Sequence, residues 1–138
     1  NVTFAGILGG GGTHQNNLGL TKSGAGVLTL TNTANSYTGQ TIISGTGSAG
    51  TLQIGANEVI PDASEVVISH GGKFVVGLAT PGSYTETIRG LSGAASAASL
   101  VEAFDAATGG ADITGNLIIH TAGGTFDFGG FVRDRGGS

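Results

Sequence analysis

The chain of 138 residues has no cysteine, no methionine and no tryptophan, and only 2 prolines. Without cysteine it forms no disulfide, so a small domain of this sequence has to rely on backbone pairing and core packing. Charged residues are 10% of the chain, against about a quarter in an average soluble protein. The 5 basic residues are scattered apart from Arg133 and Arg135, and the net charge is −4. Nucleic-acid binding is therefore not expected, since no basic stripe collects phosphates.

Long apolar runs are also missing, and no stretch is long enough to cross a bilayer as a helix. No signal peptide is in view, and the first residue is Asn1 and not Met. We therefore expect a processed product or an excised segment.

Glycine is abundant, with 28 residues, and hydrophobic residues make up 38% of the chain. A flexible Gly/Ser linker has a similar glycine content but lacks the runs of β-branched residues found here. Short segments with alternating apolar residues lie between glycine-rich turns, as at 27–31, 51–54 and 73–76. Period-two alternation is typical of half-buried strands, so the sequence predicts an all-β fold.

The apolar segments recur at a nearly constant spacing. Phe4, Leu28, Leu52, Phe74, Phe104 and Phe128 follow one another at steps of 24, 24, 22, 30 and 24 residues. A second apolar residue follows four of them 14 residues later, at Leu18, Ile42, Val66 and Ile88. This repeat predicts a right-handed parallel β-helix (β-solenoid) of about six rungs, with about 22–24 residues per rung and stacked internal ladders.

The predicted core consists of the apolar residues on the inner face of these strands. They are Leu28, Leu30, Leu52, Ile54, Phe74, Val76, Phe126 and Phe128, with Ile42, Val66 and Ile88 on the second strands. The long step of 30 coincides with an Ala/Ser-rich stretch, which predicts a loop insertion near 91–100. Two alternatives stay open over 96–106, a strand with a loop or one short amphipathic helix.

Residues 20–41 carry the most specific motif. The sequence is LTKSGAGVLTL at 20–30 and NSYTGQT at 35–41. A separate GGTF segment lies much later, at 123–126. This pattern resembles the autotransporter-associated β-strand repeat. The resemblance implies a parallel β-helix stalk of a secreted or surface-displayed bacterial protein, and a structural element without catalytic activity.

The two ends of the chain are similar to each other. Phe4-Ala5-Gly6-Ile7-Leu8 aligns with Phe128-Gly129-Gly130-Phe131-Val132 at an offset of 124 residues. This predicts a single domain over 1–138, made of a 124-residue unit and the start of a next-copy-like rung at 126–138. Neither end shows a cap, and an uncapped rung leaves unpaired N–H and C=O groups.

Two interpretations of these ends are open. The chain is a slice of a longer passenger, with adjoining repeats of the same chain as its partners, or a subunit that stacks head to tail into an open filament. The expected interface is formed by the terminal apolar residues Phe4, Ile7, Leu8, Phe128, Phe131 and Val132. We expect Phe131→Asp to leave the monomer folded and to abolish assembly.

A competing hypothesis is an adhesive or carbohydrate-active β-helix with possible cell-surface or glycan contacts. Glu102 and Asp105 are its candidate acids, but no Lys or Arg lies beside them in the sequence, and solvated surface charges are the more ordinary interpretation. His14, His70 and His120 are isolated in sequence, so no metal site is predicted, and no cofactor motif is present. With two Tyr and no Trp, a glycan-stacking platform is not favoured. The sequence thus predicts a protein that is not an enzyme.

Overall fold

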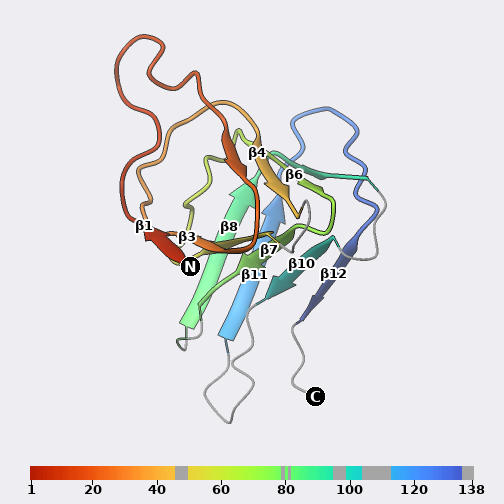
Figure 1. The fold of residues 1–138 in the computed structure, drawn as a ribbon. Helices are drawn as coiled ribbons and strands as arrows, with labels where there is room; N and C mark the ends of the chain where they lie inside the picture. The colour runs from red at the N-terminus through yellow and green to blue at the C-terminus, as the bar shows by residue number, and fades with distance from the viewer. Residues whose placement is uncertain (46–49, 79, 81, 95–98, 104–112, 135–138) are drawn as a thin grey trace.

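Parallel strands wind around one core in the computed structural model, which describes residues 1–45, 50–78, 80, 82–94, 99–103 and 113–134 (Figure 1). The described residues contain strands and no helix. The largest sheet has six parallel strands in the order β1 (Val2–Phe4), β3 (Gly26–Leu30), β5 (Gly50–Ile54), β7 (Lys73–Val76), β10 (Leu100–Ala103) and β12 (Phe131–Asp134). We call this the first sheet.

The second sheet has four parallel strands, β2 (Leu20–Lys22), β4 (Thr41–Ser44), β6 (Glu65–Ser69) and β9 (Gly90–Ser92). Over most of the chain the strands alternate between the two sheets, which is the winding of a β-solenoid. The predicted fold class is therefore confirmed, but the solenoid has about four turns and not six. The count differs because the first sheet has six strands, whereas the second has four in the described residues and ends at β9.

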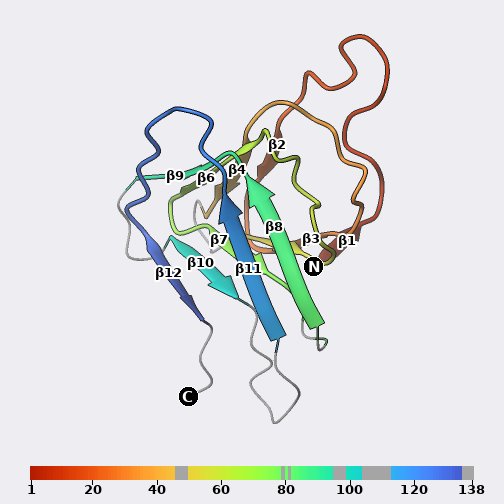
Figure 2. The same cartoon turned by 180° about the vertical axis from the view of Figure 1, so that it is seen from behind.

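A third wall closes the solenoid in its C-terminal half. β8 (Gly82–Ile88) and β11 (Ile113–Ile119) pair in parallel along seven residues, and both views show them side by side (Figures 1 and 2). Earlier turns have no strand on this side. The segment 55–64 lies there and donates the Glu58 N–H to the Thr85 carbonyl of β8 at 3.0 Å.

The inner faces of the strands form the core. The first sheet stacks Leu28 on Leu52 and Leu52 on Phe74, as the spacing predicts. Of the residues expected in the core, Leu28, Phe126 and Phe128 are half-buried, and Leu28 and Phe128 pack against the buried cluster. The remaining ones, apart from Ile42, are buried: Leu30, Leu52, Ile54, Phe74, Val76, Val66 and Ile88.

Ile42 does not lie on the inner face. It is half-buried and pairs with Val67, whereas Ile43 is fully buried and pairs with Ile68. Thr41 is the residue that stacks on Val66. Since neighbouring residues of a strand point to opposite faces, an error of one residue reverses the prediction.

Other parts of the predicted ladder also differ from the observed register. Ile88 pairs with Ile119 in the third wall, while Val66 stacks on Leu91, so the 14-residue offset does not follow one ladder. Phe4 pairs with Leu30 and not with Leu28. Phe128 forms an isolated bridge with Gly93 and is not a member of the first sheet. Phe104 lies outside the described residues.

The residues that occupy equivalent positions at the two ends of the first sheet therefore differ from the predicted pair, Phe4 and Phe128. In the first sheet the row that holds Leu28 begins at Val2 and ends at Val132, so these two residues occupy equivalent positions. The 124-residue unit stays a prediction.

Around the expected insertion, Leu100–Ala103 is a strand between β7 and β12. The helical alternative is thus not adopted over these four residues, and residues 95–98 and 104–106 lie outside the described part.

At Gly93, which follows β9, two turns are in close contact, and this contact requires a glycine. A Cβ at Gly93 would collide with the carbonyl oxygen of Ile68, so no larger residue fits there.

The observed phase of β4 leads to a first prediction. Ile43→Ala removes a fully buried side chain and should lower the free energy of unfolding by about 2–5 kcal/mol. Ile42→Ala, its matched control on the other face, should cost much less. Chemical denaturation of both variants measures this, and an equal or larger loss for Ile42→Ala would contradict the assigned phase.

Candidate functional site

Side-chain hydrogen bonds join successive turns on the side where the early turns lack a strand. Asn35 is the central residue of this contact. Its Oδ1 accepts the Leu8 N–H at 2.8 Å, and its Nδ2 donates to the Val59 carbonyl at 2.7 Å and the Asn32 carbonyl at 2.9 Å. Leu8 and Val59 belong to the turns before and after Asn35. One amide side chain thus links three turns, because an amide both donates and accepts.

Glu86 continues this line of contacts toward the C-terminal end. It lies on β8 on the same face as Ile88 and is fully buried. Its Oε2 accepts the Val59 N–H at 3.0 Å, and its Oε1 accepts the Ile60 N–H at 2.9 Å. We call the contacts of Asn35 and Glu86 the polar ladder.

Two further side chains fix the segment 55–64 to β8. Asn57 Oδ1 accepts the Thr85 N–H at 3.0 Å. The Glu58 carboxylate accepts the Thr87 N–H at 2.9 Å and the Thr87 hydroxyl at 3.0 Å. Glu58 itself has a φ of 51°, in the left-handed region that is uncommon for a non-glycine residue. Backbone groups of β8 that would bind a neighbouring strand are therefore satisfied by a loop.

The interior of the solenoid also contains a chain of hydroxyl groups. Tyr37 OH and Thr41 Oγ1 are 2.7 Å apart, and Thr41 Oγ1 and Ser64 Oγ are 3.0 Å apart. Ser64 then donates to the Gly39 carbonyl at 2.9 Å. Burial raises the pKa of Tyr37 to about 12, although its hydrogen bond to Thr41 acts in the opposite direction. This network keeps buried hydroxyls paired, as a stable core requires.

Glu86 has the most strongly altered carboxyl in the core. Burial raises its pKa from 4.5 to about 8, because the charged form loses its hydration. The two backbone N–H groups of Val59 and Ile60 act against this rise, while the nearby charges of Glu58 and Asp62 add to it.

An outer carboxylate, Glu65, behaves differently. It binds the Ser92 hydroxyl and accepts a hydrogen bond from Gln40 Nε2 at 2.9 Å. These hydrogen bonds, from Ser92 first, hold the pKa of Glu65 below its usual value. Gln40, Glu65 and Ser92 lie on three successive turns, so this contact supports the stacking from outside.

The acid considered for catalysis, Glu102, lies on β10 in register with Arg133 of β12. It is 2% exposed, and its carboxylate is 2.6 Å from Arg133 Nη2. The other candidate, Asp105, lies outside the described residues.

The three histidines are exposed and distant in sequence. His14 and His70 occupy left-handed turn positions, with φ values of 67° and 50°. Within the described part of the chain, no three His, Cys, Asp or Glu side chains come together as a group that could hold a metal ion.

The expected interface residues lie at the two ends of the solenoid. At one end Val2, which pairs with Leu28, is 64% exposed, and Phe4 and Ile7 are exposed beside it. Leu8 is half-buried against the core. We call this the N-terminal face.

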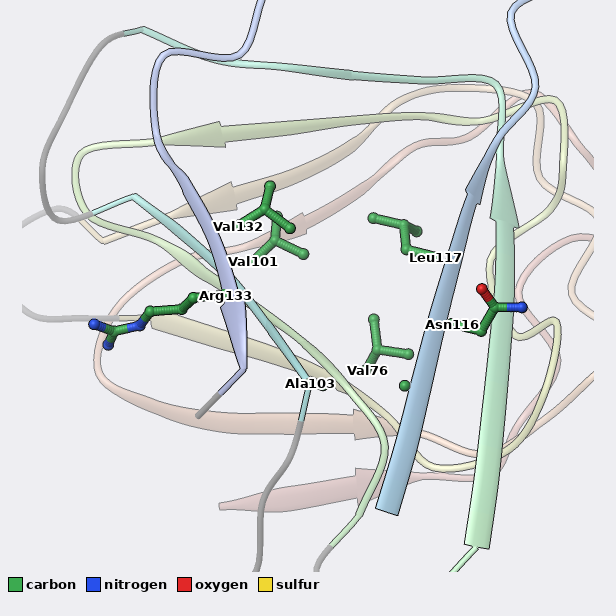
Figure 3. Close-up of a pocket in the computed structure, with 8 residues that line it drawn as sticks. Val76, Val101, Ala103, Asn116, Leu117, Val132 and Arg133 are labelled. Atoms are coloured by element: carbon green, nitrogen blue, oxygen red, sulfur yellow. The ribbon is translucent and has the colours of Figure 1, made fainter. Parts of the chain in front are cut away.

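At the other end Val132 is 67% exposed and Phe131 is also exposed. Val76, Val101, Leu117 and Val132 point into the space between β11 and the edge formed by β10 and β12, while Arg133 points away (Figure 3). This hollow has a volume of about 380 Å³. A second hollow of about 510 Å³ is lined by Ile119, Phe126, Phe128 and Val132. We call this end the C-terminal face.

Residues 20–54, which form β2 to β5, match the family of passenger-associated-transport-repeats. This segment is similar to a passenger-associated transport repeat. The predicted resemblance to autotransporter passenger repeats is thereby confirmed. The repeat spans the motif at 20–41 and two strands of the first sheet, β3 and β5, which pair along five residues.

Searches of curated proteins and of solved structures found no match to this chain. In the described residues, no helix meets the length and apolarity needed to span a membrane.

Sequence reasoning did not single out Asn35 or Glu86 for the polar ladder. Asn35 belongs to the NSYTGQT motif, so the motif that contains it was recognised, but nothing in the sequence indicated the hydrogen-bond partners of its side chain. Glu86 could have been found from strand alternation, which places it on the same face as the buried Ile88.

The polar ladder leads to a second prediction. Asn35→Ala leaves the Leu8 N–H and the Val59 carbonyl without their partner, and should lower the free energy of unfolding by about 1–3 kcal/mol. The matched control is Thr33→Ala in the same loop, where an exposed side chain is shortened. Urea denaturation of the two variants checks this, and equal effects would show that Asn35 does not join the turns.

Proposed function

We propose that this chain is a rigid structural rod of a secreted bacterial surface passenger, extended at both faces by further β-solenoid rungs. The passenger-associated repeat at 20–54 and the parallel β-solenoid fold support an exported passenger segment. The proposed location is outside the cell or at its surface. In this role the chain binds other rungs and carries out no reaction.

The observation that carries the proposal is the chemistry of the two faces. β1 and β12 are the outermost strands of the first sheet, and each exposes an apolar residue from the row that is buried in the middle of the solenoid. A further parallel rung would cover Val2 or Val132 and would pair the free backbone groups of the edge strand.

Within a longer passenger, the further rung would belong to an adjoining repeat of the same chain. The finer form of the proposal is stacking of identical subunits, the C-terminal face of one on the N-terminal face of the next. Val2 and Val132 occupy equivalent positions in one row, which supports continuation of the ladder across such a contact. A head-to-tail contact of this kind does not close on itself and gives a filament.

The carbohydrate-active alternative has weaker support. Glu102 is buried and bound to Arg133, an arrangement that holds β12 on β10. Loss of polysaccharide turnover in Glu102→Gln would nevertheless favour that alternative over the structural role.

Aspartate at the C-terminal face tests subunit stacking. Val132→Asp and Phe131→Asp place a charge on exposed positions of β12, so each should leave the monomer folded and abolish end-to-end association. Thr33→Asp, an exposed change outside β1 and β12, is the control and should still associate. Gel filtration and negative-stain imaging measure association, and circular dichroism measures folding.

The outcomes separate the two forms of the proposal. Uniform fibres from the unaltered chain and none from the β12 variants support subunit stacking. Fibres of normal length from the β12 variants would overturn it. A chain that is monomeric or aggregates irregularly would restrict the proposal to rungs of the same passenger.

A further inference from the structure

The two edges of the third wall differ in their hydrogen bonding, and the edge formed by β11 is open. His120 donates its N–H to the Ile88 carbonyl of β8 at 2.8 Å. Because successive residues of a strand direct their N–H groups to alternate sides, those of Gly115, Leu117 and Ile119 face away from β8. Within the described part of the chain, β11 pairs with β8 alone, and these three N–H groups have no partner there.

The opposite edge of the third wall, on β8, is closed by side chains. The Thr85 N–H donates to Asn57 Oδ1 at 3.0 Å, and the Thr87 N–H donates to the Glu58 carboxylate at 2.9 Å. These donors are not free to bind a further strand. The third wall can therefore be extended from β11 and not from β8.

The sequence of β11 does not protect its open edge. Residues 113–119 are ITGNLII, without a charged residue or a proline. Native proteins usually blunt an exposed edge strand with charged side chains or proline, or cover it with another segment. Ile118 and Ile119 are 44% and 45% exposed, and Leu117 points into the hollow of about 380 Å³ beside β12 (Figure 3). This combination indicates that a further segment covers β11.

We propose that β11 accepts a strand, and that the occupant is a third-wall strand of an adjoining rung. This inference rests on the proposed function and names the part of the rung that the C-terminal face binds. The pairing of β11 with β8 is the precedent within this chain, since it is parallel over seven residues and stacks Leu117 on Glu86 and Ile119 on Ile88. The occupant pairs in the same way and carries apolar side chains over Leu117 and Ile119.

The N-terminal face of an identical subunit does not offer such a strand. Between β1 and β2, residues 5–19 form no strand. Their backbone is folded into turns, in which the Gly10 N–H donates to Asn16 Oδ1 and the Leu18 N–H donates to the Asn16 carbonyl, both at 2.8 Å. In a stack of identical subunits β12 would pair with β1, and β11 would stay unpaired. The strand on β11 thus separates the two forms of the proposed function.

A peptide with the sequence of residues 113–119 tests the acceptor edge on the unaltered chain. In parallel pairing it stacks each of its side chains on the identical residue of β11. At about ten times its dissociation constant, we expect the peptide to slow amide exchange of Gly115, Leu117 and Ile119 about tenfold. Exchange of Ile118, whose N–H faces β8, should not change. Non-specific adhesion of the peptide would not produce this alternation.

The two exposed isoleucines of β11 provide matched variants. Ile119→Lys places a charge on the face that the incoming strand covers, and should abolish the protection by the peptide. Ile118→Lys adds the same charge at almost the same exposure but on the opposite face, and should keep the protection. Circular dichroism measures whether both variants fold. If Ile119→Lys does not fold, a peptide with Asp in place of Leu117 replaces it and should give no protection.

Amide exchange of Leu117 and Ile119 that the peptide leaves unchanged would overturn the inference, and so would equal protection in Ile119→Lys. A spin label at the N-terminus of the peptide reports the strand direction. Strongest broadening at Thr114 supports parallel pairing, and strongest broadening at Ile119 would overturn it. None of these results decides the proposed rod function, because gel filtration and imaging test that function without the peptide.

Discussion

Parallel pairing between successive turns is the constraint on which this structure depends. Each strand satisfies its N–H and C=O groups only through the turns before and after it. That requirement fixes the register of the first sheet, which stacks Leu28, Leu52, Phe74, Val101 and Val132 in one row. With no cysteine to close the fold, the row of apolar side chains and the hydrogen bonds beside it have to provide cohesion together.

The polar ladder solves the same problem where no strand is available. A loop cannot offer a regular series of backbone groups, so Asn35 supplies both a donor and an acceptor between neighbouring turns. Glu86 takes over where loops give way to the β8–β11 wall, and there both contacts come from backbone donors. Two donors suit a carboxyl better than an amide, whose NH₂ group would face one of them. The cost of burying this acid is the source of its raised pKa.

The sequence was sufficient for the fold class because alternation and glycine spacing are local signals. They predicted the stacking of Leu28, Leu52 and Phe74 without further information. The second strand was harder, because a shift of one residue exchanges Ile42 for Ile43 on the inner face. Ile88 was placed on the wrong ladder since nothing local announces a third wall. The polar ladder depends on partners 24–27 residues apart, which no local pattern reveals.

The C-terminal face combines a fixed strand with an uncovered apolar row. Arg133 and the buried Glu102 hold β12 in register on β10, and the neighbouring Val132 is exposed to solvent. The position of β12 therefore does not require a further rung. A strand that is already ordered loses less conformational entropy when another strand pairs with it. This preorganisation, together with the exposed Val132, supports the proposed addition of a rung at the C-terminal face.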